Sequence, residues 1–189
     1  MAAHVMKEAL ARAKLEAGKI EDVVLGCGLP EGATGHNIAR NAALFAGFGV
    51  GVPGVTVNRY CGSGLTAASF VANAIAKGEI ACGMAGGVES ISLVQFNLNF
   101  NGFFYEPLQR IMPAVWWTMN QSADFTAATH GITRQELDEY VVMSQKRVAE
   151  AAAAGKYGEE IVPFARQMKV TDKASGQSSI ADVTLDRDE

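Results

Sequence analysis

The 189-residue sequence has few cysteines, no clustered basic residues and no long apolar run. Its three cysteines, Cys27, Cys61 and Cys82, are widely spaced and form no Cys-x-x-Cys pair, which disfavours a disulfide framework and a zinc site. Sixteen scattered basic residues against 20 acidic ones argue against a nucleic-acid binder, which needs a basic face. No apolar run reaches the roughly 18 residues of a membrane span. A soluble protein of a reducing compartment is therefore expected, in the cytoplasm, with mitochondria and peroxisomes as alternatives.

Glycine is abundant, at 20 residues, and much of it follows apolar runs, where it marks tight turns. Several of these runs lack polar alternation, which is typical of parallel strands covered on both faces; they span 23–27, 55–60 and 80–85. Helical patterns alternate with them, over 3–17, 37–48 and 65–76. The last of these helices has almost no polar face and is expected to be buried. This alternation predicts an α/β fold with a mainly parallel sheet between helices.

The pattern changes at residue 91, where a long aromatic-rich stretch with little periodicity begins. It is longer than a plain connection and indicates an inserted region. Helices are expected over 122–130 and, after a capping box that starts at Thr133, through Ala154. The polar tail from Lys169, with a turn near Gly176, is not expected to complete an element. We therefore divide the chain into an α/β domain, 1–90, and a loop domain, 91–189.

Cys61 is the residue most suggestive of chemistry, because it stands between an apolar strand and an apolar helix. That position is the carboxyl edge of the sheet, where open α/β folds bind ligands. The start of a helix carries partial positive charge and N–H groups, which lower the pKa of a nearby thiol and can bind an oxyanion. Gly62 and Gly64 let the backbone approach a substrate. The pattern predicts a nucleophile for acyl transfer, with a buried structural cysteine as the alternative.

The other candidate residues receive structural interpretations, because sequence alone places none of them next to Cys61. Histidine is the usual proton carrier near neutral pH, and a carboxylate at a strand end could act as an acid. We expect surface or satisfied polar roles for His4, His36 and His130, inert packing for Cys27 and Cys82, and hydrogen bonding at a strand end for Glu89, with a catalytic acid as its alternative.

The residues around Cys61 resemble a known family. The segment 58–65, NRYCGSGL, is similar to the active-site segment of thiolases, the acyl-CoA acetyltransferases. The segment 85–90, AGGVES, resembles the motif that follows it in that family at the expected interval. Residues 35–40 resemble the upstream GQNPAR segment, and 131–145 resemble a helix of the thiolase loop domain. The resemblance covers most of 4–189 and implies an incomplete thiolase-like layered fold with an inserted loop domain.

The resemblance implies a ping-pong reaction in which Cys61 attacks an acyl-CoA thioester and holds the acyl group. A second acetyl-CoA, or free CoA in the degradative direction, then takes that group. Coenzyme A thioesters are substrates here, and no cofactor is implied. Met119 matches a position of the acyl pocket, with plain loop-domain core as the alternative. The strand 55–60 matches the segment through which thiolases pair their subunits, so a homodimer or tetramer is implied.

Several thiolase elements do not occur in this sequence. They are an opening strand with its Arg-Thr-Pro turn, a strand after the loop domain, a Gly-His-Pro histidine and a Cys-x-Gly-Gly-Gly acid/base. Without the histidine and the second cysteine Cys61 has no obvious base, so we expect an N-terminal-half fragment that is inactive alone. Two alternatives are a non-catalytic truncated module that acts only in dimerisation or structure, and a ketosynthase of the same fold.

Overall fold

The computed structural model describes residues 1–187. It forms two compact units, of which the first combines Met1–Leu98 with the segment that begins at Val162. The second unit is Asn99–Ile161. The division at residue 90 that we expect from the sequence follows the change of pattern at residue 91, and it stays a prediction.

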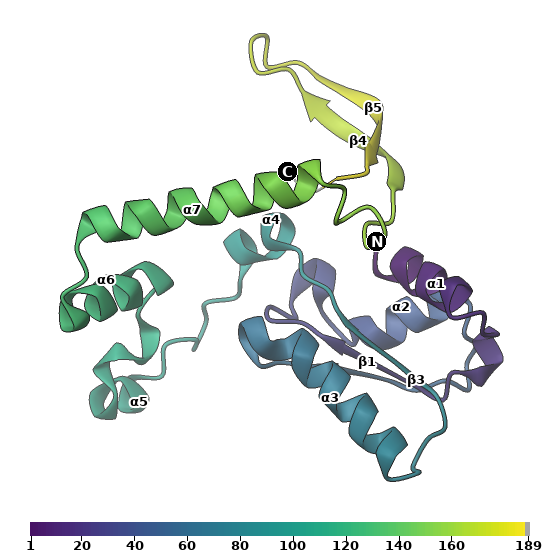
Figure 1. Cartoon of the computed structure of the whole chain (residues 1–189). Coiled ribbons are helices and arrows are strands. Elements are labelled where there is room, and N and C mark those ends of the chain that lie inside the picture. The colour runs from purple at the N-terminus through teal and green to yellow at the C-terminus, as the bar shows by residue number, and fades with distance from the viewer. Residues whose placement is uncertain (188–189) are drawn as a thin grey trace. The chain divides into compact units, whose positions relative to one another are not determined.

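The first unit is built on a parallel sheet of three strands (Figure 1). These are β1 (Asp22–Gly26), β2 (Gly54–Val57) and β3 (Gly83–Gly87), in the order β2-β1-β3. In register, Leu25 of the central strand lies between Thr56 and Gly86. The predicted mainly parallel sheet is confirmed. The strand expected over 55–60 ends at Val57, because the chain bends there toward the 3-10 turn Tyr60–Gly62.

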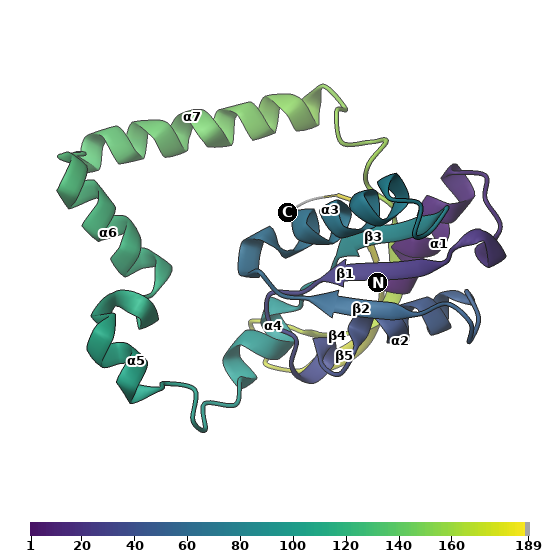
Figure 2. The same cartoon turned by 90° about the horizontal axis from the view of Figure 1, so that it is seen from below.

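Helices cover both faces of this sheet (Figure 2). On one face lie α1 (Ala2–Arg12) and α2 (Ile38–Ala46), and on the other lies α3 (Ser63–Ala76). The side chains of alternate residues of β1 pack on opposite faces of the sheet. Val23 and Leu25 belong to the cluster with α1 and α2, whereas Val24 packs with Ala67 and Val71 of α3. The period of two along a strand thus produces the two apolar layers.

The helix α1 is shorter than the predicted 3–17. It ends at Arg12, and Lys14 adopts a left-handed φ of 55°. The N–H of Leu15 donates to the carbonyl of Leu10, and that of Lys14 to Ala11. These are the two bonds of a Schellman ending, formed here with lysine in place of the usual glycine. The pattern that continues to residue 17 therefore belongs to a separate turn, Ala17–Lys19.

The prediction that α3 is buried throughout is wrong for the described residues. Ala67 and Val71 face the sheet and are 0% and 6% exposed. Leu65, Phe70 and Ile75 are exposed, Leu65 to 80%. A sheet covers only one side of a helix, and the described part of the chain brings no second layer over the other side.

The segment after Val162 forms an antiparallel hairpin of β4 (Phe164–Thr171) and β5 (Ser178–Leu185). Gly176 supplies the left-handed residue of the expected turn, with φ 71°. The expectation of a tail without a completed element is wrong, because the alternation of side chains along both strands was hidden by their polar composition. Residues 188 and 189 of that tail lie outside the described residues.

The connections and the second unit are mainly helical. In the second unit, α6 and α7 begin with capping boxes, from Thr118 to Gln121 and from Thr133 to Glu136. The second box confirms the predicted start of α7, whereas the first makes α6 begin before the predicted residue 122. None of the described helices is long and apolar enough to cross a membrane. The remaining elements are α4 (Ile91–Val94), α5 (Glu106–Ile111), α6 (Met119–His130), α7 (Arg134–Ala153) and the 3-10 turns Gly32–Thr34, Gln95–Asn97 and Pro113–Trp116.

The end of β1 and the start of α3 are in direct contact. A Cβ added to Gly26 would lie 2.2 Å from the carbonyl carbon of Ser63 and 2.5 Å from the backbone nitrogen of Gly64. Both neighbours are backbone atoms at the start of a helix, which cannot move aside alone. Only glycine fits at this position without displacing α3 from the sheet.

We predict that Gly26→Ala lowers the free energy of unfolding by at least about 2 kcal/mol, because the added methyl overpacks this contact. Urea unfolding monitored by circular dichroism measures the change. The matched control is Gly51→Ala, because a Cβ at Gly51 meets nothing within 4 Å. Equal unfolding midpoints for the two variants would contradict the packing of α3 on β1.

Candidate active site

The thiol of Cys61 is exposed in the 3-10 turn Tyr60–Gly62, directly before α3. The apolar strand β2 leads into this turn, and α3 leads out of it toward the opposite end of the sheet. Cys61 therefore stands at the carboxyl edge of the parallel strands, beside the amino end of a 14-residue helix. A helix start of this length presents partial positive charge and unpaired N–H groups.

The turn that carries Cys61 has an unusual backbone. Tyr60 has a φ of 44°, a left-handed conformation that is uncommon for a bulky residue. Its N–H donates to Asn58 Oδ1 at 2.9 Å. The hydroxyl of Ser63 accepts from the N–H of Arg59 at 2.8 Å and donates to the carbonyl of Tyr60 at 2.6 Å. Two of these bonds hold Tyr60, the residue that precedes Cys61, and the third holds Arg59 before it.

Cys61 lines a cavity of about 700 Å³ that lies entirely within the first unit. The segments that follow all three strands of the sheet contribute to its walls, together with α4 and the turn after it. Among the described residues that line it, Glu89 alone is charged and none is a histidine. The lining residues are Gly26, Gly28, Leu29, Tyr60, Cys61, Ser63, Gly64, Gly87, Val88, Glu89, Ile91, Gln95 and Leu98.

Comparison with known proteins agrees with this geometry. The family model of the thiolase N-terminal domain matches residues 1–187. The chain belongs to the thiolase family. It is 38% identical over 161 residues to a 3-ketoacyl-CoA thiolase of Bacillus subtilis, covering 84% of this chain and 40% of that protein. It is 38% identical over 174 residues to an acetyl-CoA acetyltransferase of Cupriavidus necator, covering 86% and 44%.

A third relative is a beta-ketoadipyl-CoA thiolase of Escherichia coli, 35% identical over 185 residues, which cover 89% of this chain and 46% of the relative. The matched region thus spans less than half the length of these thiolases. Family membership confirms the resemblance drawn from the segments around Cys61 and residues 85–90. The α/β architecture expected of a thiolase amino-terminal domain is likewise confirmed.

Glu89 binds backbone groups in this thiolase chain. Its carboxylate accepts the N–H of Gly28 at 2.7 Å and that of Leu29 at 3.3 Å. The thiol of Cys27 donates to the same carboxylate at 3.5 Å. Glu89 therefore ties the segment after β1 to the segment after β3 and forms part of the cavity wall. These contacts support the structural interpretation of Glu89 over that of a catalytic acid.

The other two cysteines differ from Cys61 in exposure. Cys27 is 1% exposed, and burial raises the pKa of its thiol above the usual value of 9.0, an effect that the nearby Glu89 carboxylate reinforces and Thr34 opposes. Cys82 is half-buried and packs against the core beneath α1 and α2. The sequence analysis expects Cys82 within a strand over 80–85. The structure places it just before β3, which begins at Gly83.

The histidines fall at three separate places in the chain, and none is among the described residues that line the cavity beside Cys61. His4 lies on α1, and its Nε2 is 2.9 Å from the carbonyl of Pro163 while its ring packs edge-on against Phe164. His36 occupies the loop before α2 with a left-handed φ of 58°. His130 is the last residue of α6 in the second unit. All three fit the structural roles expected from the sequence.

Met119 begins α6 in the second unit, and 74% of it is exposed. This exposure excludes the alternative that Met119 is part of a core among the described residues. Its place in an acyl pocket stays a prediction. Sequence reasoning missed the cavity walls supplied by Ile91, Gln95 and Leu98, because these short helical turns lack an apolar period that would have identified them.

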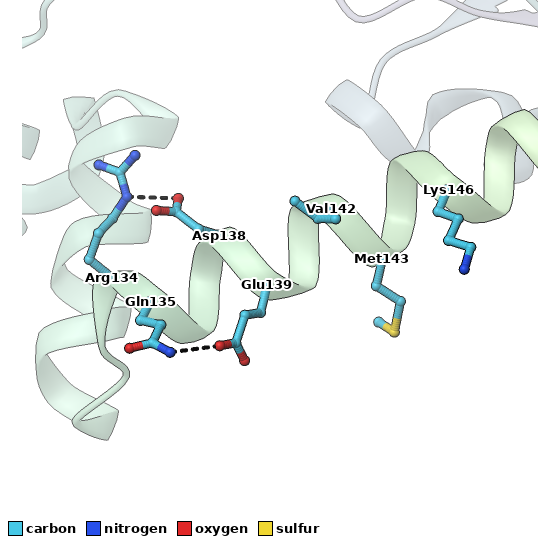
Figure 3. A pocket seen from close by; sticks show the side chains of 7 residues that line it. All are labelled: Arg134, Gln135, Asp138, Glu139, Val142, Met143 and Lys146. Carbon is cyan, nitrogen blue, oxygen red and sulfur yellow. Dashed lines mark hydrogen bonds and ion pairs between the residues drawn. The ribbon is translucent and has the colours of Figure 1, made fainter.

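A second hollow lies along α7 and is less suited to chemistry (Figure 3). Its seven lining residues all come from this one helix, between Arg134 and Lys146. Arg134 pairs with Asp138 at 2.8 Å, and Gln135 donates to Glu139 at 2.8 Å. These polar side chains satisfy one another along the helix. The described residues also contain no cluster of metal ligands.

We predict that iodoacetamide alkylates Cys61 at least about tenfold faster than Cys27 at neutral pH, because Cys27 is buried and carries less thiolate. Cys82 is expected to react at an intermediate rate. Mass spectrometry of tryptic peptides from the native chain measures the three rates, with the urea-unfolded chain as the control for intrinsic reactivity. Equal rates in the native chain would count against a distinct environment for Cys61.

Proposed function

We propose that this chain carries the nucleophile of a thiolase, and that Cys61 receives the acyl group of an acyl-CoA. The observation that supports this most is the exposed thiol at the amino end of α3, open to a cavity at the carboxyl ends of the strands. Its 3-ketoacyl-CoA thiolase and acetyl-CoA acetyltransferase relatives point to the same reaction class. Acyl-CoA and CoA are the substrates in this proposal, and no cofactor takes part.

In the first half-reaction, the thiolate of Cys61 attacks the thioester carbonyl and forms a new carbon–sulfur bond. The bond to the sulfur of coenzyme A breaks, and coenzyme A leaves as a thiol after gaining the proton that Cys61 lost. In the synthetic direction, an acetyl-CoA carbanion then attacks the acylated cysteine, a carbon–carbon bond forms, and Cys61 leaves as the thiolate while 3-ketoacyl-CoA is released. In the degradative direction, the Cys61 thiolate attacks the 3-keto carbonyl of a 3-ketoacyl-CoA, acetyl-CoA leaves as a carbanion that takes up a proton, and a CoA thiolate then takes the acyl group and frees Cys61. Negative charge develops on the carbonyl oxygen in both steps, and the amino end of α3 is placed to stabilise it.

Proton transfer is the part of this reaction for which the described cavity offers no residue. Its one charged residue, Glu89, has its carboxylate bonded to backbone N–H groups of Gly28 and Leu29. A general base must lie within hydrogen-bond reach of the proton it takes. The family resemblance implies the histidine of a Gly-His-Pro motif and the cysteine of a Cys-x-Gly-Gly-Gly motif for this role, and neither motif occurs among the 189 residues. We therefore propose that the isolated chain holds the nucleophile without completing turnover.

We expect the purified chain to show no thiolysis of acetoacetyl-CoA by CoA above the uncatalysed rate, because the described residues that line the cavity offer no free base for Cys61 and no free acid for the acceptor. Loss of the absorbance of the magnesium enolate of acetoacetyl-CoA is the measurement, and Cys61→Ala is the matched control. Robust turnover that Cys61→Ala abolishes would show that the chain is a complete catalyst.

Pairing of two chains through β2 is the second part of the proposal. β2 pairs with β1 on one side only, and no strand pairs with its other edge among the described residues, where the carbonyl of Gly54 accepts from Asn37 Nδ2 at 2.7 Å. Val55 on this strand is 42% exposed. A free edge of this kind pairs readily with another strand. If the chain is a non-catalytic module, this edge is the feature that would give it a structural role.

We predict that Val55→Asp shifts the chain from dimer to monomer, because it places like charges at the two-fold edge. Sedimentation velocity at several protein concentrations measures the shift. The control is Val50→Asp, since Val50 is 86% exposed in the turn before β2. A wild-type chain that is monomeric at all concentrations would reject β2 as the dimer edge.

A further inference from the structure

Ser63 is the first residue of α3 and is only 3% exposed, although it is polar and adjoins an open cavity. Its hydroxyl makes two hydrogen bonds within the turn. It accepts from the N–H of Arg59 and donates to the carbonyl of Tyr60. We propose that Ser63 is a positioning residue, which holds Tyr60 in its left-handed conformation and thereby places the Cys61 thiol at the amino end of α3. This inference rests on the proposed role of Cys61 as the nucleophile.

The conformation of Tyr60 needs an external restraint. A left-handed φ brings Cβ close to the following carbonyl, which costs free energy in every residue other than glycine. Tyrosine has no short polar side chain to offset this locally, unlike asparagine or aspartate. Strained residues persist only where their surroundings determine them. At Tyr60 the restraint comes from Asn58 on its N–H and from Ser63 on its carbonyl.

Serine is well suited to this restraint. A hydroxyl both accepts and donates, so one atom bonds the backbone on each side of Tyr60. The backbone of Ser63 is itself fixed, because it packs against Gly26 at the end of β1. The Ser63 hydroxyl is therefore held in place by the contact of α3 with the sheet. Its two hydrogen bonds fix the turn that carries Cys61 relative to β1. Alanine at this position would leave the N–H of Arg59 and the carbonyl of Tyr60 without this partner.

The effect of removing the hydroxyl is expected to stay local. Ala67 and Val71, which also pack α3 against β1, lie further along the helix than Ser63, and their packing does not use its hydroxyl. Tyr60 would relax toward negative φ, and Cys61 would move away from the helix start. Cys27, buried beside Glu89, reports on opening of the unit as a whole. The relative rates of the cysteines thus separate a positioning role from a general loss of stability.

The test is peptide-resolved alkylation of the full chain by iodoacetamide in Ser63→Ala. We expect the Cys61 rate to fall by about tenfold, a factor equivalent to about 1.4 kcal/mol, while the rates at Cys27 and Cys82 are unchanged. Ser63→Thr, which keeps the hydroxyl, should restore the Cys61 rate to within about twofold. The matched control is Thr66→Val, because Thr66 is a buried hydroxyl of the same helix that bonds the carbonyl of Gly62; it should leave the Cys61 rate within about twofold.

A second variant keeps the inference testable if threonine does not fit. In a Tyr60→Gly background, residue 60 adopts positive φ without strain. There Ser63→Ala should change the Cys61 rate by less than about twofold, since there is no strain left to restrain. An equal loss in both backgrounds would overturn the mechanism.

The outcomes separate this inference from the proposed function. A wild-type Cys61 that reacts no faster than Cys82 would reject the nucleophile itself. A fast wild-type Cys61 that Ser63→Ala leaves unchanged would reject only the role of Ser63. A rise in Cys27 labelling in Ser63→Ala would show that the hydroxyl stabilises the unit generally, and would also reject positioning.

Discussion

The contact between the end of β1 and the start of α3 is the constraint on which the site depends. Gly26 lacks a side chain, and the backbone of Ser63 and Gly64 occupies the space where one would be. This contact fixes the amino end of α3 at the carboxyl edge of the sheet. The turn before α3 must then reverse the chain within a few residues of the end of β2. The left-handed Tyr60 and the exposure of Cys61 both follow from that short reversal.

The cavity beside Cys61 depends on a second link across the same edge. Glu89 follows β3 and bonds the backbone that follows β1, so the exits of two neighbouring strands are held together. A carboxylate that accepts two N–H groups is a strong cross-link, because charged acceptors form the stronger hydrogen bonds. Gly28 leaves room for it, since a Cβ there would lie 2.8 Å from the carboxylate oxygen. The wall of the cavity is therefore set by backbone geometry, and its apolar residues fill the space that remains.

Much of this architecture was accessible from the sequence, and the limits have physical causes. Apolar runs without alternation identified the three parallel strands, and the capping box at Thr133 located α7. The strand–cysteine–helix order placed Cys61 at the sheet edge. Left-handed residues such as Lys14 and Tyr60 could not be predicted, because hydrogen bonds of the surrounding turn hold them against the ordinary preference of lysine and tyrosine. The hairpin of β4 and β5 was missed because its polar faces mask the period of two. The cavity walls come from segments distant in sequence, which local patterns cannot bring together.

The side of α3 that faces away from the sheet is uncovered among the described residues. It adjoins the turn in which, in the proposed function, a thiol must be activated and its proton transferred. Leu65 begins that side and is 80% exposed, close to the turn that carries Cys61. The activation of a thiol by a helix end is local and needs only the turn, α3 and the sheet beneath it. Proton transfer needs a second group on the open side of the cavity, and the described residues place none there. A helix that is apolar on the side away from its own sheet is suited to bind a further layer of protein. In the proposed function, placement of the nucleophile and transfer of its proton are thus separate requirements, and the described residues provide for the first.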